Sequence, residues 1–223
     1  MNALVITGTD RGVGKTWVGR ALGRALSAAG RRVVAIMPVE TGCSDATARL
    51  EDGPLLAAAT GQAEPQTALH RFAAPVAPAL AAEAEGGTID LDALILRIEA
   101  LGEGADLVLI EGAGGLLTPI TWEWTVVELA RALSATVLVV AADRLGVINH
   151  AQLTLSALEL AGLEVTGVVL TAPETPDAST GTNALAIARL GGLAQVPTIP
   201  RMDDPAGAGP LVVDILDWIS AAR

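Results

Sequence analysis

The chain has 223 residues, of which 51% are hydrophobic and 17% are charged, and its formal net charge at pH 7 is −11. This length and apolar content suit one α/β domain over residues 1–223, and the negative charge argues against nucleic acid or an anionic membrane as a partner. One cysteine excludes an internal disulfide, no apolar run reaches the roughly 18 residues of a membrane span, and no secretory leader is recognisable, so we expect a cytoplasmic protein.

The first predicted unit is a strand, a glycine-rich loop and a helix. Ala3–Thr7 is a short apolar run with β-branched residues, and Lys15–Ala29 repeats apolar residues at helical spacing. Between them lies Gly8–Thr16, which ends in Gly-Lys-Thr and is called the phosphate loop below. The N–H groups of such a loop surround phosphate oxygens, its lysine reaches the β- and γ-phosphates, and its threonine can bind Mg²⁺.

Two details of this loop bear on the prediction. Lys15 is the only lysine of the chain, whereas thirteen arginines carry the other positive charges. The planar fork of arginine fits a narrow phosphate nest poorly, so the amine is retained where it has a role. Five residues separate Gly8 from Gly14, where the usual pattern has four. We predict a protein that uses a nucleoside triphosphate.

The rest of the chain alternates apolar runs with helical patterns. Further strands are expected at Arg32–Met37, Leu107–Ile110, Thr136–Ala141, Val165–Thr171 and Pro197–Ile199. Further helices are expected at Gly53–Thr60, Leu91–Leu101, Val126–Leu133, Val147–Ala161, Ala178–Leu190 and Val212–Ala221. Continuously apolar strands are typical of a parallel sheet buried on both faces. The alternation predicts a doubly wound α/β fold, with a mostly parallel sheet and helices on both of its faces.

Ligands of such sheets bind beyond the carboxyl ends of the strands. The loops expected there are Thr7–Thr16, Pro38–Thr41, Glu111–Thr118, Ala142–Asn149 and Thr171–Asp177. They contain four distinctive segments in fixed order, namely Gly8–Thr16, Pro38–Gly42, Glu111–Gly115 and Leu145–Thr154. Together these segments resemble the dethiobiotin synthetase family, and the likeness runs from residue 1 to about residue 200.

The resemblance implies a P-loop NTPase fold and a homodimeric cyclo-ligase. The family converts 7,8-diaminononanoate, CO₂ and ATP to dethiobiotin, ADP and phosphate, with Mg²⁺ as the metal. A substrate amine takes up CO₂ to form a carbamate, whose oxygen attacks the γ-phosphorus, and the second amine then displaces phosphate from the mixed anhydride. Because positioning and charge stabilisation carry such transfers, the enzyme needs no nucleophile of its own.

The resemblance also implies roles for individual residues. Nucleotide contacts are expected from Gly12, Val13, Gly14, Lys15, Thr16, Trp17, Asp52, Glu111, Gly112, Ala113, Gly114, Thr171, Ala172, Pro200 and Arg201. Substrate contacts are expected from Thr9, Thr41, Gly115, Leu145, Gly146, Val147 and Asn149. Of these, residues 145–149 would offer backbone N–H groups to the substrate carboxylate across the dimer interface. Lys15, Thr41 and position 37 form the expected catalytic set.

The expected Mg²⁺ ligands are Thr16, Asp52 and Glu111. Glu111 ends a buried strand, where a carboxylate otherwise has little reason to be. Asp52 opens a predicted helix, so it can equally be a helix N-cap. Glu51 and Asp45 are rivals for the same acidic position.

The chain departs from the family pattern at the end of the second strand. The family has Lys-Pro-Val there, whereas this chain has Met37-Pro38-Val39 and no other lysine that could substitute. Loss of a cation beside a developing charge can cost about 10²–10³-fold in rate. One interpretation is that the enzyme is weakened, or that it binds nucleotide without turnover. The other is that Arg11 or Arg144 has taken over the role of the family lysine.

A second departure concerns the nucleotide base. The family often has Asn-Asp after the fifth strand, where this chain has Thr171-Ala172. Threonine cannot make the two-pronged amide contact to the edge of adenine, so the base preference stays open. A partition or switch ATPase is the rival class, but such proteins usually carry a second lysine at the start of the phosphate loop, which Thr7–Asp10 lacks.

Overall fold

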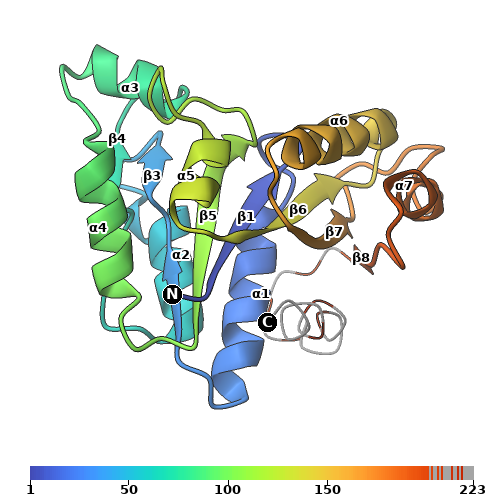
Figure 1. The fold of residues 1–223 in the computed structure, drawn as a ribbon, viewed down its shortest axis with the longest axis horizontal. Coiled ribbons are helices and arrows are strands. Elements are labelled where there is room, and N and C mark those ends of the chain that lie inside the picture. The colour runs from blue at the N-terminus through green and yellow to red at the C-terminus, as the bar shows by residue number, and fades with distance from the viewer. Residues whose placement is uncertain are drawn as a thin grey trace.

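A sheet of six parallel strands runs through the part of the chain that the structure describes, in the order β2-β5-β1-β6-β7-β8 (Figure 1). The strands are β1 (Ala3–Gly8), β2 (Val33–Ile36), β5 (Leu107–Gly115), β6 (Thr136–Ala142), β7 (Val165–Thr171) and β8 (Thr198–Ile199). This computed structural model describes residues 1–200, Met202, Pro205, Gly207, Val212, Ile215 and Asp217. The predicted helix at 212–221 therefore lies largely outside the described residues, and Arg201 lies outside them too.

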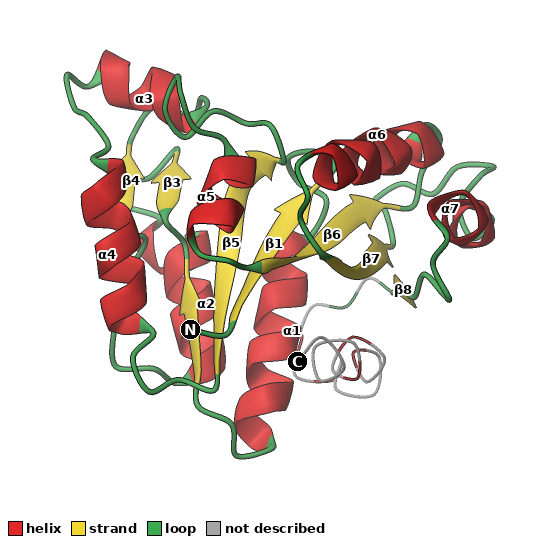
Figure 2. Ribbon diagram, in the orientation of Figure 1, coloured by secondary structure: helices red, strands yellow, loops and turns green. Residues whose placement is uncertain are grey.

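Helices cover both faces of the sheet (Figure 2). Those behind the sheet in the view are α1 (Lys15–Ala28) and α2 (Asp52–Thr60), and those in front include α4 (Leu91–Leu101), α5 (Val126–Ala132), α6 (Val147–Leu160) and α7 (Asn183–Gly191). Each face has its own apolar cluster, because successive side chains of a strand point to opposite faces. In β1, for example, Val5 packs towards α5 while Leu4 and Ile6 pack towards α1. The predicted doubly wound α/β fold is confirmed.

Several predicted boundaries were wrong. Residues 111–115 were expected in a loop but continue β5, whose end pairs with β1 through Gly8 and Gly115. The seventh helix begins at Asn183 rather than Ala178, because Asp177 accepts hydrogen bonds from the N–H and hydroxyl of Ser179 and holds a turn there. Short turns with polar side chains compete with the helix in this way.

A small second layer was not predicted from the sequence. It consists of β3 (Val39–Thr41), β4 (His70–Phe72), the 3₁₀ turn η1 (Ala48–Leu50) and α3 (Pro78–Ala84). The two strands pair in parallel as a separate sheet beside the carboxyl end of β2. Each has only three residues, which is too short for a periodic pattern to be read. No helix in the described part of the chain has the length and apolar character that a membrane crossing demands.

Candidate functional site

Two cavities share the phosphate loop at the carboxyl edge of the sheet. The first, of about 630 Å³, lies between the loop, the start of α2 and the end of β5. The second, of about 470 Å³, lies between the loop and the ends of β7 and β8. Arg11, Gly12 and Gly14 line both cavities. The loop can therefore serve one ligand that extends into both.

The phosphate loop has the backbone that its glycines predicted. Gly14 has a φ of 91° and precedes Lys15, the first residue of α1, so the N-terminus of that helix faces the loop. A left-handed φ favours glycine, and a helix N-terminus attracts anions. Gly8 is required for space, because a Cβ there would lie 2.8 Å from the carbonyl oxygen of Asp10.

Lys15 lies folded against this loop. Its side chain is buried, and Nζ donates a hydrogen bond to the carbonyl oxygen of Asp10 at 3.1 Å. Burial lowers the pKa of the amine, while the negative charges of Glu111, Asp52 and Asp10 oppose that shift. The ammonium therefore lies between the loop and a group of carboxylates.

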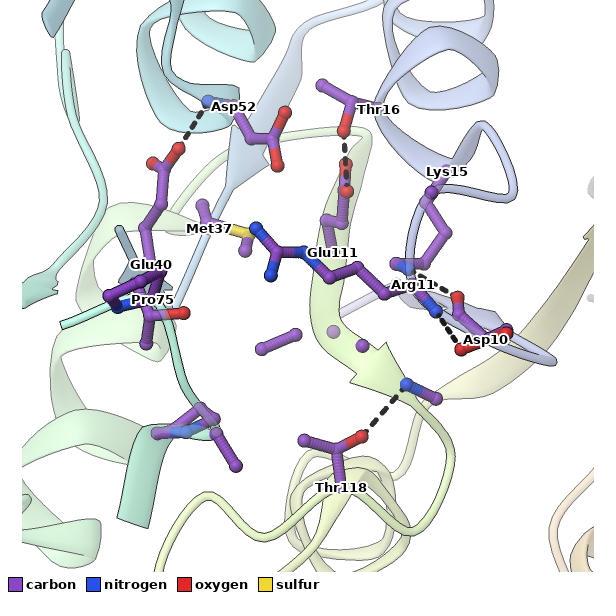
Figure 3. Close-up of a pocket in the computed structure, with 18 of the residues that line it drawn as sticks. Asp10, Arg11, Lys15, Thr16, Met37, Glu40, Asp52, Pro75, Glu111 and Thr118 are labelled. Atoms are coloured by element: carbon purple, nitrogen blue, oxygen red, sulfur yellow. Dashed lines mark hydrogen bonds between the residues drawn. The ribbon is translucent and has the colours of Figure 1, made fainter. Parts of the chain in front are cut away.

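Glu111 is the centre of that group. It is 1% exposed, and its Oε1 accepts a hydrogen bond from the hydroxyl of Thr16 at 2.8 Å (Figure 3). Burial, reinforced by the charge of Asp52, raises the pKa of the Glu111 carboxyl to about 8, although Thr16 and Lys15 oppose the shift. Its Oε2 is buried without a hydrogen-bond partner among the described residues. An orphaned carboxylate oxygen beside a threonine hydroxyl is a donor set that fits Mg²⁺.

Asp52 belongs to the same group. It is the first residue of α2 and lines the first cavity, and Figure 3 shows its carboxylate directed towards Thr16 and Glu111. The alternative role of N-cap was wrong, because Glu51 occupies that position. Glu51 is itself held by two 2.8 Å hydrogen bonds from Arg71, and exposed Asp45 does not line the cavity. Of the three acidic rivals, the structure brings only Asp52 to Glu111.

Glu40 is a functional neighbour that sequence reasoning missed. It lies buried in β3, and its carboxylate accepts hydrogen bonds from the backbone N–H groups of Asp52 and, at 3.0 Å, Gly53. Burial raises its pKa, while these two N–H groups lower it. Glu40 thus caps α2 from outside and fixes the position of Asp52. Two features of the sequence could have indicated this role. Glu40 is a single carboxylate just after an apolar strand, and the helix that follows has no capping side chain of its own.

Met37 and Arg11 also line the first cavity. Met37 is 5% exposed and follows β2. Figure 3 shows the Arg11 side chain extending from the phosphate loop into the cavity, with its guanidinium directed towards Met37. Arg144 instead lines the second cavity and forms an ion pair with Asp10, with 3.6 Å between Nη2 and Oδ2. Arg11 therefore borders both cavities, whereas Arg144 borders only the second of the two.

The glycine-rich end of β5 forms the floor of the first cavity, which Gly112, Ala113, Gly114 and Gly115 all line. Gly114 has a φ of 68°. The N–H of Gly115, which was expected to face substrate, donates to the hydroxyl of Thr118 at 2.9 Å. Thr118 therefore ties down the end of this segment, a role that the sequence did not suggest.

The predicted substrate residues divide into two groups. Thr41 lines the first cavity. Thr9 does not, because its N–H donates to the carbonyl oxygen of Val140 at 3.0 Å and its surface faces a small separate hollow beside Val147. The structure therefore brings Thr41, but not Thr9, to the carboxylates.

Leu145, Gly146, Val147 and Asn149 lie at the start of α6. None of these four residues is among the described residues that line the first or the second cavity. Leu145 is 80% exposed, and its N–H donates to Oδ2 of Asp177 at 2.8 Å. Gly146 precedes the helix with a φ of 93°. Within one chain, these groups do not reach the carboxylates.

The second cavity is bordered by apolar side chains and backbone, and also by the charged side chains of Arg11, Arg144 and Glu174. Trp17 lines it and donates from Nε1 to the carbonyl oxygen of Met202 at 2.9 Å. Thr171 donates from its hydroxyl to the carbonyl oxygen of Val13 at 2.7 Å, and the Ala172 N–H donates to the carbonyl oxygen of Ile199 at 2.9 Å. Pro200, for which a nucleotide contact is expected, also lines this cavity.

Comparison with known proteins agrees with this arrangement. A sequence model of the family described as AAA domain matches residues 2–206. The ATP-dependent dethiobiotin synthetase BioD of Anaeromyxobacter dehalogenans is 46% identical over 194 residues, 85% of this chain and 86% of the relative. A protein of the same name from Anaeromyxobacter sp. is 44% identical over 92% of this chain and 93% of its own length. In fold alone, a solved DUF1611 family protein from Anabaena variabilis is similar, with a TM-score of 0.57 and 17% identity. That alignment spans 99% of this chain and 57% of the other.

Proposed function

This chain belongs to the dethiobiotin synthetase family, and we propose that it converts 7,8-diaminononanoate, CO₂ and ATP to dethiobiotin, ADP and phosphate. Membership makes it an ATP-dependent ligase of biotin biosynthesis. The observation that carries the assignment is the buried group of Thr16, Glu111 and Asp52 beside Lys15, at the place where the two cavities share one phosphate loop.

In this proposal the nucleoside lies in the second cavity and the triphosphate follows the phosphate loop towards the first. The N–H groups at the start of α1 and the Lys15 amine face the phosphates. The first cavity then receives the diamine, whose carbamate must meet the γ-phosphorus. The backbone of Gly112–Gly114, which has no bulky side chains, allows that approach, and Thr41 borders the same space.

Thr16, Glu111 and Asp52 would hold Mg²⁺, which neutralises phosphate charge during such transfers when it is bound. The unpartnered Oε2 of Glu111 supports this assignment. Burial and the neighbouring charge of Asp52, which raise the pKa of Glu111, also make a divalent cation favourable at this place. Glu40 contributes by holding Asp52 in place.

A homodimer is part of the proposal, and a cytoplasmic location is retained as a prediction. Exposed apolar side chains lie along α6 and just before it, with Leu145 at 80%, Leu153 at 62% and Leu160 at 89% exposure. Such a face suits contact with a second copy. In that arrangement the N–H groups at residues 145–149 that are not already bonded within the chain, as those of Leu145 and Val147 are, would bind the substrate carboxylate of the partner's site. A protein that is monomeric at assay concentration, yet fully active, would contradict the shared site.

A steady-state assay tests the function directly. Purified protein is supplied with 7,8-diaminononanoate, bicarbonate, Mg²⁺ and each of the four nucleoside triphosphates, and dethiobiotin and phosphate are both measured. We expect equal amounts of the two products, and none without the diamine. Tight nucleotide binding with no product under any of these conditions would instead identify a protein that binds nucleotide without turnover.

A further inference from the structure

The first cavity has an imbalance of charge among the residues that line it. Four carboxylates face it or border it, from Asp10, Glu40, Asp52 and Glu111. Among its described lining residues the only cations are Lys15 and Arg11. The Lys15 amine is hydrogen-bonded to the loop itself through the carbonyl oxygen of Asp10. The cation with a free head group in this cavity is therefore that of Arg11.

The backbone of Arg11 is held by a hydrogen bond, whereas its guanidinium has no partner among the described residues. Its N–H donates to Oδ1 of Asp10 at 2.7 Å, which holds the loop at this point. The guanidinium has no hydrogen bond or ion pair with any residue that the structure describes. Its positive charge lies close enough to Lys15 to lower the pKa of that amine. Two cations from one loop thus face the same cavity, and an anion bound near both would be stabilised by them.

The direction of the side chain identifies which anion. Arg11 lines both cavities, and its guanidinium extends into the first cavity towards Met37 (Figure 3). A triphosphate that follows the loop presents its last phosphate there. Arginine stays charged at any working pH, and its fork matches phosphate oxygens two at a time. Met37 contributes no charge at this place.

We propose that Arg11 binds the γ-phosphate within the first cavity and stabilises the charge on that group during its transfer. This inference rests on the proposed function for the identity of the acceptor. A carbamate oxygen forms the new bond to phosphorus while the bond from phosphorus to the β–γ bridging oxygen breaks, and the electron pair leaves with ADP. Arg11 exchanges no proton in this step and acts by charge alone.

The test begins with nucleotide binding, measured by calorimetry with ATP and with ADP in the presence of Mg²⁺ but without diamine. Arg11→Ala should weaken ATP binding about tenfold or more and ADP binding by less than about threefold, because only ATP carries the phosphate concerned. Arg97→Ala is the matched control, since that exposed arginine pairs with Glu64 away from both cavities and should alter neither affinity. Equal losses for ATP and ADP would overturn the proposal.

Turnover supplies the second readout. Arg11→Ala should reduce the rate of dethiobiotin formation about 10²-fold or more. The double variant that also carries Met37→Lys should be at least about tenfold faster than Arg11→Ala alone. A purely structural role of Arg11 in the loop predicts no such recovery, so its absence would contradict the assignment. If the native protein forms no dethiobiotin, the proposed function fails, while the ratio of ATP to ADP affinity still decides the role of Arg11.

Discussion

The two cavities that share the phosphate loop are lined by different kinds of groups. The first is bordered by ionisable side chains that act on one another, as Thr16 does on Glu111 and Glu40 does on the start of α2. The second is bordered by several apolar side chains, by polar groups already bonded to backbone, such as Thr171 to Val13, and by the charged side chains of Arg11, Arg144 and Glu174. The carboxylates that act on one another are therefore found at the first cavity.

This difference determines how each cavity should respond to mutation. Charged groups placed beside a developing charge contribute strongly to rate, so single changes in the first cavity should have large effects on turnover. Apolar and backbone contacts change little when one side chain is altered conservatively. The predictions below test that contrast, beginning with the change that should matter most.

Lys15→Ala should reduce turnover by about 10³-fold or more, because the phosphates lose the only lysine of the chain. The fold should survive, since the side chain contacts the loop and not the apolar clusters. Dethiobiotin formation and thermal unfolding are measured on the same preparation. A folded variant with near-normal turnover would remove the basis for the nucleotide-driven reaction.

Glu111→Gln should lower turnover by about 10²-fold and abolish its stimulation by Mg²⁺. Glutamine keeps the shape and can still accept the hydrogen bond from Thr16, but it supplies no negative charge to a metal. The comparison of turnover against Mg²⁺ concentration in the two proteins isolates the charge. Unchanged dependence on Mg²⁺ would show that Glu111 is not a metal ligand.

We also expect Glu111→Gln to change how the stability of the folded protein depends on pH. Burial raises the pKa of Glu111 from the ordinary 4.5 to about 8 in the folded chain. A raised pKa contributes stability that is fully present below the ordinary value and is lost as pH rises through the folded value. The metal-free native protein should therefore lose stability between about pH 4.5 and pH 8, and Glu111→Gln should lose less. Melting temperatures measured across this range, without Mg²⁺, check the difference.

The first cavity was also the part of the site that the sequence predicted best. Thr16, Lys15 and Glu111 belong to short motifs whose residue types determine their chemistry, and the structure brings them together. The roles of Glu40 and Arg11 could not be predicted in the same way. Glu40 reaches α2 only because three-residue strands place it there, and the choice between Arg11 and Arg144 depends on side-chain direction.

The second cavity also shows what could not be predicted from the sequence. Trp17 could be assigned to the nucleotide, but its hydrogen bond to Met202 spans 185 residues of sequence. The fold was predicted wherever an element was long enough for periodicity to show, as in α1 and β6. It was missed in α3 and β4, which are short and depend on packing against β3.

The base of the nucleotide should matter less than its phosphates. The Thr171 hydroxyl and the Ala172 N–H are already bonded to Val13 and Ile199, so neither is available to read a base edge. A two-pronged contact, which discriminates strongly, is absent from these two residues. We expect the four triphosphates to support turnover with kcat/KM values within about tenfold of one another. A preference for ATP of more than about 10²-fold would require a base reader that these residues do not supply.

Asp177→Asn should have the smallest effect, because Asp177 lines neither cavity and holds the loop that follows β7 against Leu145. It accepts hydrogen bonds from the N–H of Leu145 and from Ser179, which lower its pKa to about 2. A lowered pKa contributes stability that is present above the ordinary value of 3.8 and is lost as pH falls through the folded value. The variant should therefore melt slightly below the native protein at pH 7, with turnover changed by less than about threefold, because an exposed charge is largely screened by solvent. The difference in melting temperature should shrink as pH falls from about 4 to about 2. A difference that stayed constant over that range would mean that the Asp177 charge does not hold the loop.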